Sequence, residues 1–147
     1  MRRWFLIGLV LVLVLAGCGG ASAPAASEPA PETPATAEAV HHAWVQALRN
    51  NDRAAALRLM APQIDPSYTD SRLSDRAQMV DGSELFGAFV EVGPLYLRDA
   101  GAGRIGYSTW VLEKRTECYA TSLALVDGGV WRVTQSGLSR MENCTAQ

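Results

Sequence analysis

Hydrophobic residues are distributed unevenly along the chain, in segments that differ in their spacing. Trp4 to Ala16 is a run of 13 residues without charge, mostly Leu, Val and Ile, whereas residues 19–35 contain no large apolar side chain. From about residue 36 the apolar positions recur with helical spacing, and from Gly93 they alternate as in strands. The pattern predicts a short apolar leader, a spacer and one folded domain.

Two amphipathic helices are predicted at the start of the folded domain. Thr33 or Thr36 can cap the first helix, and Asn50-Asn51 ends it. Asp52 can cap the second, which Pro62 ends because proline cannot continue the hydrogen-bond ladder. The apolar positions follow a helical spacing and are Val40, Ala43, Trp44, Ala47 and Leu48 in the first helix and Ala55, Ala56, Leu59 and Met60 in the second.

The segment between these helices and Gly93 is mostly polar. Within residues 63–82 we expect only a weak helical turn, from Ser74 to Val80. Ser83 can cap a further turn that contains Phe86 and Phe89.

The remainder of the chain predicts four strands separated by glycine-rich turns, at residues 94–98, 104–114, 117–126 and 130–138. In the last hairpin, a three-residue loop at residues 127–129 pairs Leu125 with Trp131 and Leu123 with Val133. This register keeps both apolar sets on one face, and Gly129 is then expected in the left-handed region. Helices followed by an antiparallel meander predict an α+β fold, with N-terminal helices packed on a curved four-stranded antiparallel sheet.

Two segments of this domain resemble the nuclear transport factor 2-like superfamily. Residues 40–57 (VHHAWVQALRNNDRAAAL) are similar to its opening pair of helices, and residues 129–133 (GVWRV) are similar to its closing strand. The chain resembles in particular the small lumazine-binding-like domains carried by lipoproteins, over most of residues 37–147. The resemblance implies a cone-shaped fold. Members of the superfamily often dimerise through the sheet, and nothing in this sequence decides whether this chain does.

The leader ends in Leu15-Ala16-Gly17-Cys18, which resembles the lipobox of a bacterial lipoprotein signal peptide. Its 13 apolar residues are too few for a spanning helix, which needs about 20. The resemblance implies that residues 1–17 are removed and that Cys18 carries a diacylglycerol and acyl chains such as palmitate. Residues 18–36 would then be a tether, semi-stiff because of its prolines. We expect a domain at residues 37–147 that is anchored by lipid on the extracytoplasmic face, at the cell surface or in the periplasm.

The charge balance argues against some partners. After residue 17 the chain carries 11 basic and 15 acidic residues, a net charge of −4. A general nucleic-acid binder needs a concentrated positive face, so we expect no nucleic-acid partner. The expected partners are the membrane, through the lipid, and a small molecule or a protein of the cell envelope.

Two further cysteines remain, Cys118 in the third predicted strand and Cys144 after the fourth. In an exported protein they are expected to form a disulfide bond. The predicted register places Cys118 opposite Leu138, so the following residues can return Cys144 to it. Closing this loop stabilises the fold by roughly 3.5 kcal/mol on the chain-entropy estimate.

Evidence for catalysis in the sequence is weak. His41 and His42 are adjacent on a helix, about 100° apart, and cannot share a metal ion. The sequence has no GxSxG, HExxH or phosphate-loop motif, and we predict no metal site and no cofactor. The leading interpretation is a non-enzymatic binding module, and the alternative is a pocket enzyme of the isomerase or lyase type. By resemblance, its candidate residues between helices and sheet are His42, Tyr96, Asp99, Tyr107 and Tyr119.

Overall fold

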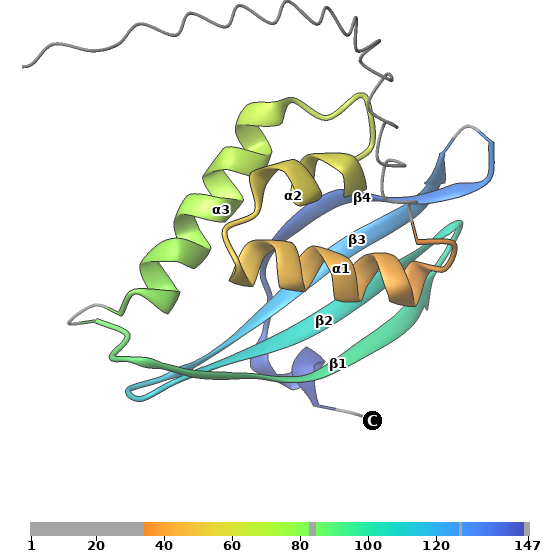
Figure 1. Ribbon diagram of the computed structural model, residues 1–147. Helices are drawn as coiled ribbons and strands as arrows, with labels where there is room; N and C mark the ends of the chain where they lie inside the picture. Colours follow the sequence, from red (N-terminus) through yellow and green to blue (C-terminus); the bar gives the residue numbers. More distant parts are fainter. Residues whose placement is uncertain (1–33, 83–84, 127, 146–147) are drawn as a thin grey trace, which may run out of the picture. The chain divides into compact units, whose positions relative to one another are not determined.

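The computed structural model describes residues 34–82, 85–126 and 128–145. The predicted signal peptide, Cys18, most of the predicted tether and the predicted cap at Ser83 lie outside these residues. In the described part, three α-helices pack against one face of a four-stranded antiparallel sheet that does not close on itself (Figure 1). The predicted α+β class, with helices on an antiparallel sheet, is confirmed.

The first two helices form where the sequence predicts them, as α1 (Ala37–Arg49) and α2 (Arg53–Leu59). The side chains of Thr36 and Asp52 each accept a hydrogen bond from a first-turn backbone N–H, at 3.1 and 2.9 Å. Each cap therefore satisfies a donor that has no partner inside its helix. The apolar stripe of α1 turns toward the sheet, where Trp44 is fully buried.

A longer third helix replaces the weak turn expected at residues 74–80. That prediction is wrong, because α3 spans Pro66–Val80. Asp65 caps it by accepting a 2.8 Å hydrogen bond from a first-turn N–H. Pro66 lies in the first turn, where a backbone N–H has no partner inside the helix, so the absence of its N–H removes no helical hydrogen bond. The apolar spacing of α3 is weak because two of its inward residues, Thr69 and Arg76, are polar and completely buried.

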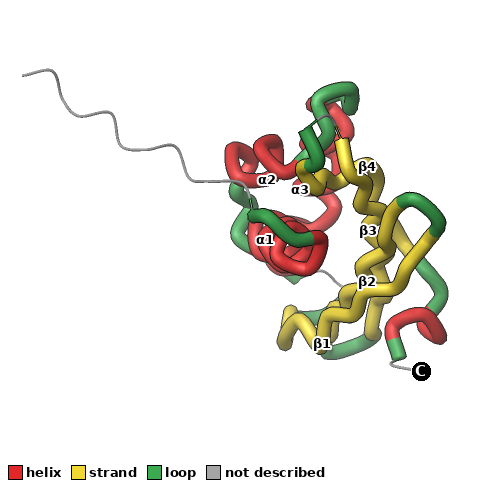
Figure 2. Tube along the Cα trace, turned by 90° about the vertical axis from the view of Figure 1, so that its right-hand side faces the viewer, coloured by secondary structure: helices red, strands yellow, loops and turns green. Residues whose placement is uncertain are grey.

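The sheet is a meander in which each strand pairs with the next one along the chain. Its order is therefore β1-β2-β3-β4, with β1 and β4 at the edges. The helices lie on one side of it, and the C-terminal segment lies on the other (Figure 2). The strands are β1 (Phe89–Ala100), β2 (Gly103–Leu112), β3 (Thr116–Val126) and β4 (Val130–Leu138).

The first strand differs most from its prediction. β1 begins at Phe89 instead of residue 94, and residues 85–88 form no helix, so the helical turn expected through Phe86 is wrong. The pairing of β1 with β2 is irregular between Val92 and Leu95. Gly93 and Pro94 lie at this irregularity, where an edge strand tolerates a proline that cannot donate to the ladder.

The last hairpin follows the predicted register near its turn. Leu125 pairs with Trp131 and Leu123 pairs with Val133, and β3 and β4 are separated by residues 127–129. Gly129 has φ 74°, in the left-handed region that glycine adopts without a steric penalty. The predicted three-residue loop is confirmed.

Farther from the turn, the register shifts by one residue. An irregularity between Ser122 and Leu123 pairs Tyr119, and not Cys118, with Leu138. The expected pair of Cys118 and Leu138 is therefore wrong by one position. Cys118 still lies beside the end of β4, because its carbonyl accepts a 2.8 Å hydrogen bond from the N–H of Ser139.

Candidate functional site

A pocket of about 370 Å³ lies against the face of the sheet that the α-helices leave uncovered. Alternation along β2 explains the position: Trp110 points toward the helices, so Tyr107 points to the opposite face. The short 3₁₀ helix η1 (Met141–Cys144) lies on the same face (Figure 2). The pocket is lined by β1, β2 and this segment, through Tyr96, Leu97, Arg98, Tyr107, Glu142, Asn143 and Thr145.

A disulfide bond holds η1 on the sheet. Cys118 of β3 is bonded to Cys144, with their Cα atoms 5.8 Å apart, so the predicted cystine is confirmed. Both cysteines are buried and form a small apolar cluster with Tyr107. The covalent bond thus fixes one wall of the pocket relative to the tyrosine that forms its floor.

The polar groups of the pocket come mainly from β1 and η1. Tyr96 lies directly opposite Tyr107 in the strand pairing. Arg98 donates a 2.7 Å hydrogen bond to the Tyr107 hydroxyl, and its guanidinium lies 5.3 Å from the centre of that ring. A guanidinium has five N–H donors in a fixed fork, so this single bond leaves donors for an oxygen atom of a ligand.

The C-terminal wall adds a second set of polar groups. The Glu142 carboxylate lies 3.5 Å from the guanidinium of Arg140, and both side chains are largely exposed. The amide of Asn143 donates to the Ser139 hydroxyl at 2.9 Å, and the Thr145 hydroxyl donates to the Glu142 carbonyl at 2.9 Å. These bonds hold the residues of the wall together and leave the Glu142 carboxylate exposed at its edge.

Of the five catalytic candidates singled out from the sequence, only Tyr96 and Tyr107 line this pocket, and it lies on the opposite face of the sheet from the interior where they were expected. Asp99 forms a 2.8 Å ion pair with Arg104, and its side chain is 83% exposed. His42 is exposed on α1. Tyr119 faces the helices, on the other side of the sheet. The five candidates therefore do not form one site.

Sequence reasoning missed Arg98 and the C-terminal wall. Arg98 is two residues after Tyr96, and the period of two in a strand places both on one face, so alternation could have identified it. The wall at residues 142–145 reaches the pocket only through the disulfide and the turn after β4. No local sequence pattern predicts that contact.

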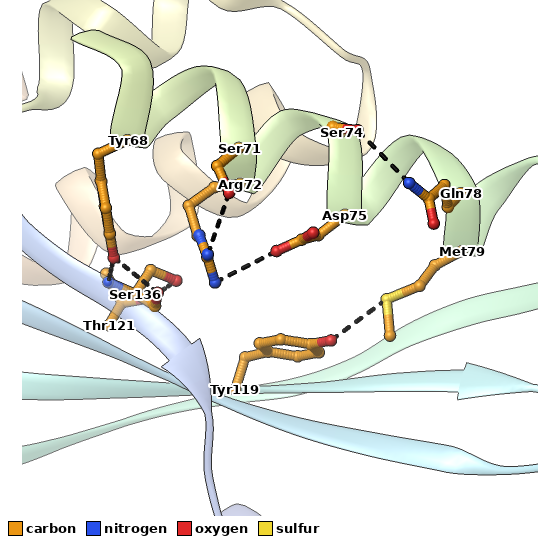
Figure 3. A network of polar contacts seen from close by, with 10 residues as sticks. All are labelled: Tyr68, Ser71, Arg72, Ser74, Asp75, Gln78, Met79, Tyr119, Thr121 and Ser136. Atoms are coloured by element: carbon orange, nitrogen blue, oxygen red, sulfur yellow. Dashed lines mark hydrogen bonds and ion pairs between the residues drawn. The ribbon is translucent and has the colours of Figure 1, made fainter.

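The interior between the helices and the sheet contains unusual polar groups. Burial lowers the pKa of His41 to about 4, and the nearby His42 contributes to the shift. Burial also lowers the pKa of Arg76 to about 10 and raises the pKa of Tyr119. Figure 3 shows polar contacts of α3, of which Tyr68 points toward Ser136 of β4 and Met79 toward Tyr119 of β3.

A comparison of the chain with protein-family models, curated protein sequences and solved structures finds no match. Within the described residues, no helix is both long and apolar enough to cross a membrane. The same residues contain no group of three or more His, Cys, Asp or Glu side chains placed to hold a metal ion.

Proposed function

We propose that the protein is a lipid-anchored module of the bacterial cell envelope that binds a small molecule without transforming it. The observation that carries the proposal is the pocket on the open face of the sheet, with Arg98 and two tyrosines in it and a disulfide-fixed wall. Its volume of about 370 Å³ falls within the range of small-molecule sites, roughly 300–1,000 Å³.

The chemistry of the pocket fits binding. Tyr96 and Tyr107 offer aromatic rings, and Arg98 offers N–H donors beside them. A ligand with a planar or apolar body and an oxygen acceptor would satisfy both. Because the Tyr107 hydroxyl already accepts a hydrogen bond from Arg98, it is held in place as part of the pocket floor.

Export and lipidation are supported by two independent features. Cys18 follows Leu15-Ala16-Gly17 directly after an uncharged run of 13 residues. The bond between Cys118 and Cys144 is typical of oxidising compartments outside the cytoplasm. The proline-rich residues 19–35 would then separate the domain from the membrane.

Membership of the nuclear transport factor 2-like superfamily is part of the same proposal. It is supported by the order of the elements, in which three helices precede a four-stranded meander, and by the last strand, which contains Trp131 and Val133. Fold alone does not assign a ligand, so the proposed activity rests on the pocket.

The binding proposal is tested by screening metabolites and fragments with two-dimensional NMR of the isotope-labelled full chain. We expect the amide signals that shift on binding to belong to residues 96–98, 107 and 142–145. Arg98→Met should weaken binding at least tenfold, whereas Arg104→Met, which removes a partly exposed arginine paired with Asp99 outside the pocket lining, should not. Ligands that shift only other residues, or that bind Arg98→Met normally, contradict the proposal. A ligand that is chemically converted contradicts its non-enzymatic part.

The anchor is tested separately with an alkyne-labelled fatty acid fed to a bacterial host. We expect label on the wild-type chain and none on Cys18→Ala, which should also leave the membrane fraction or accumulate as precursor. Label that persists on Cys18→Ala contradicts the lipidation site.

A further inference from the structure

Arg76 lies at the centre of the layer between α3 and the sheet. Its side chain is completely buried. The guanidinium carbon lies 3.2 Å from the centre of the Tyr119 ring and 5.2 Å from that of Trp110. The arginine is therefore stacked on aromatic side chains of β3 and β2, where it can make cation–π contacts.

The stacked guanidinium has no hydrogen-bond acceptor among the described residues. Its Nε, Nη1 and Nη2 atoms are all buried and unpaired. Asp75, the preceding residue, forms its ion pair with Arg72 at 3.2 Å, and Glu117 of β3 forms its ion pair with Arg115. Asp75 therefore attracts Arg76 electrostatically without pairing with it directly. Figure 3 shows Asp75 and Arg72 joined to each other on the sheet side of α3.

An unpaired buried charge is among the most costly arrangements in a folded protein. Burial lowers the pKa of Arg76 to about 10, and Tyr119 and Asp75 oppose part of that shift, so the group is charged at neutral pH. The stacking contacts offset part of the cost and leave every N–H donor unsatisfied. A partner from outside the chain would complete the site.

We propose that Arg76 anchors a second binding site, between α3 and the sheet, which takes the carboxylate of a small organic acid. The planar fork of a guanidinium matches the two oxygens of a carboxylate. A carboxylate brings one negative charge for one buried positive charge, whereas a phosphate dianion would leave a second charge unpaired. Trp110 and Tyr119, over whose rings the guanidinium lies, and Met79, which accepts a hydrogen bond from the Tyr119 hydroxyl, are buried and would contact the apolar part of the acid.

This site is separate from the pocket of the proposed function. Tyr119 and Trp110 face the helices, whereas Tyr107 and Arg98 line the opposite face of the sheet. Solvent reaches the edge of the layer beside α3, where the side chains of Arg72 and Asp75 are 25% and 45% exposed. The acid would approach from that edge.

The test titrates acetate, hexanoate and benzoate, each against its neutral amide, into the full chain and measures the thermal midpoint and the NMR spectrum. We expect at least one acid to raise the midpoint and to shift signals of α3 and of Tyr119, while its amide does neither. Arg76→Met should remove the response. Methionine fills similar space without a charge, so this variant is expected to fold.

Two further variants make the result specific. Arg98→Met, in the other pocket, should keep the response to the acid. If Arg76→Met does not fold, Arg76→Lys keeps the charge but loses the fork, and should bind the acid at least tenfold more weakly. No response to any acid, equal responses to acid and amide, a response that survives in Arg76→Met, or wild-type affinity for the acid in folded Arg76→Lys overturns the proposal. Loss of the response in Arg98→Met alone assigns binding to the outer pocket and likewise overturns it.

Discussion

The imidazole of His41 lies directly on Gly106. A Cβ atom added to Gly106 would stand 2.5 Å from His41 Cγ and 2.6 Å from both Cδ2 and Nδ1. Such distances are far inside van der Waals contact, so only glycine allows α1 to approach β2 this closely. The side chain of His41 is completely buried in the process.

Gly106→Ala should therefore lower the free energy of unfolding, by about 1–3 kcal/mol, because the added methyl group forces α1 away from the sheet. Denaturant unfolding measures the loss. Gly137→Ala is the matched control, since a Cβ at Gly137 in β4 meets nothing within 4 Å. Equal stability of the two variants would show that α1 and β2 do not meet at this point.

The buried His41 also predicts how stability depends on pH. Its pKa falls from 6.5 to about 4 on folding, mainly through burial. Between these values the unfolded chain binds a proton that the folded chain does not, so stability is lost as the pH falls from 6.5 to about 4. The full loss is roughly 3 kcal/mol.

The measurement is the free energy of unfolding at a series of pH values, compared between wild type and His41→Leu. The variant should lack this part of the acid destabilisation, while the carboxylates of the protein still contribute to both curves. His42→Gln, which changes the exposed neighbour, should retain most of it. Parallel curves for wild type and His41→Leu would contradict the prediction.

The disulfide should be a major source of stability. Cys118 and Cys144 are separated by 26 positions, and closing a loop of that size restricts the unfolded chain by about 3.5 kcal/mol. We expect a reducing agent to lower the unfolding midpoint of wild type to that of the double variant Cys118→Ala/Cys144→Ala. The reducing agent should have no further effect on the double variant. A midpoint that does not respond to reduction would be inconsistent with this bond.

Local signals allowed two of the helices and the last hairpin to be predicted. Thr36 and Asp52 are strong caps, and the apolar spacing of α1 has no competing interpretation. The loop at residues 127–129 followed from matching apolar faces. In each case the information lies within a few residues of the element that it specifies.

The missed features depend on contacts far along the chain. α3 was missed because Arg76, an inward residue, is charged, and burial of a charge cannot be inferred from spacing. β1 was shortened because Gly93-Pro94 resembles a strand boundary, whereas an edge strand accommodates it. The pocket itself was not predicted. Tyr96 and Tyr107 were singled out for a site between the helices and the sheet, whereas they line a pocket on the opposite face, and the wall that completes it is brought there by the cystine.

A single hydroxyl joins α3 to the edge of the sheet. The Tyr68 hydroxyl donates to the carbonyl of Ser136 at 2.6 Å and accepts from the N–H of the same residue (Figure 3). β4 is an edge strand, so these backbone groups have no neighbouring strand to pair with. The Tyr68 hydroxyl therefore supplies the hydrogen-bond partner that a neighbouring strand would otherwise supply.

Tyr68→Phe should thus leave a partly buried donor and acceptor unpaired and lower the free energy of unfolding by about 1–3 kcal/mol. Ser136→Ala is the control, because it removes only the hydroxyl that lies 3.3 Å from Thr121 Oγ1 and keeps both backbone bonds to Tyr68. Hydrogen exchange separates the two effects. The amide of residue 136 should exchange much faster in Tyr68→Phe and stay protected in Ser136→Ala. Protection that is equal in both variants would mean that another group covers this strand edge.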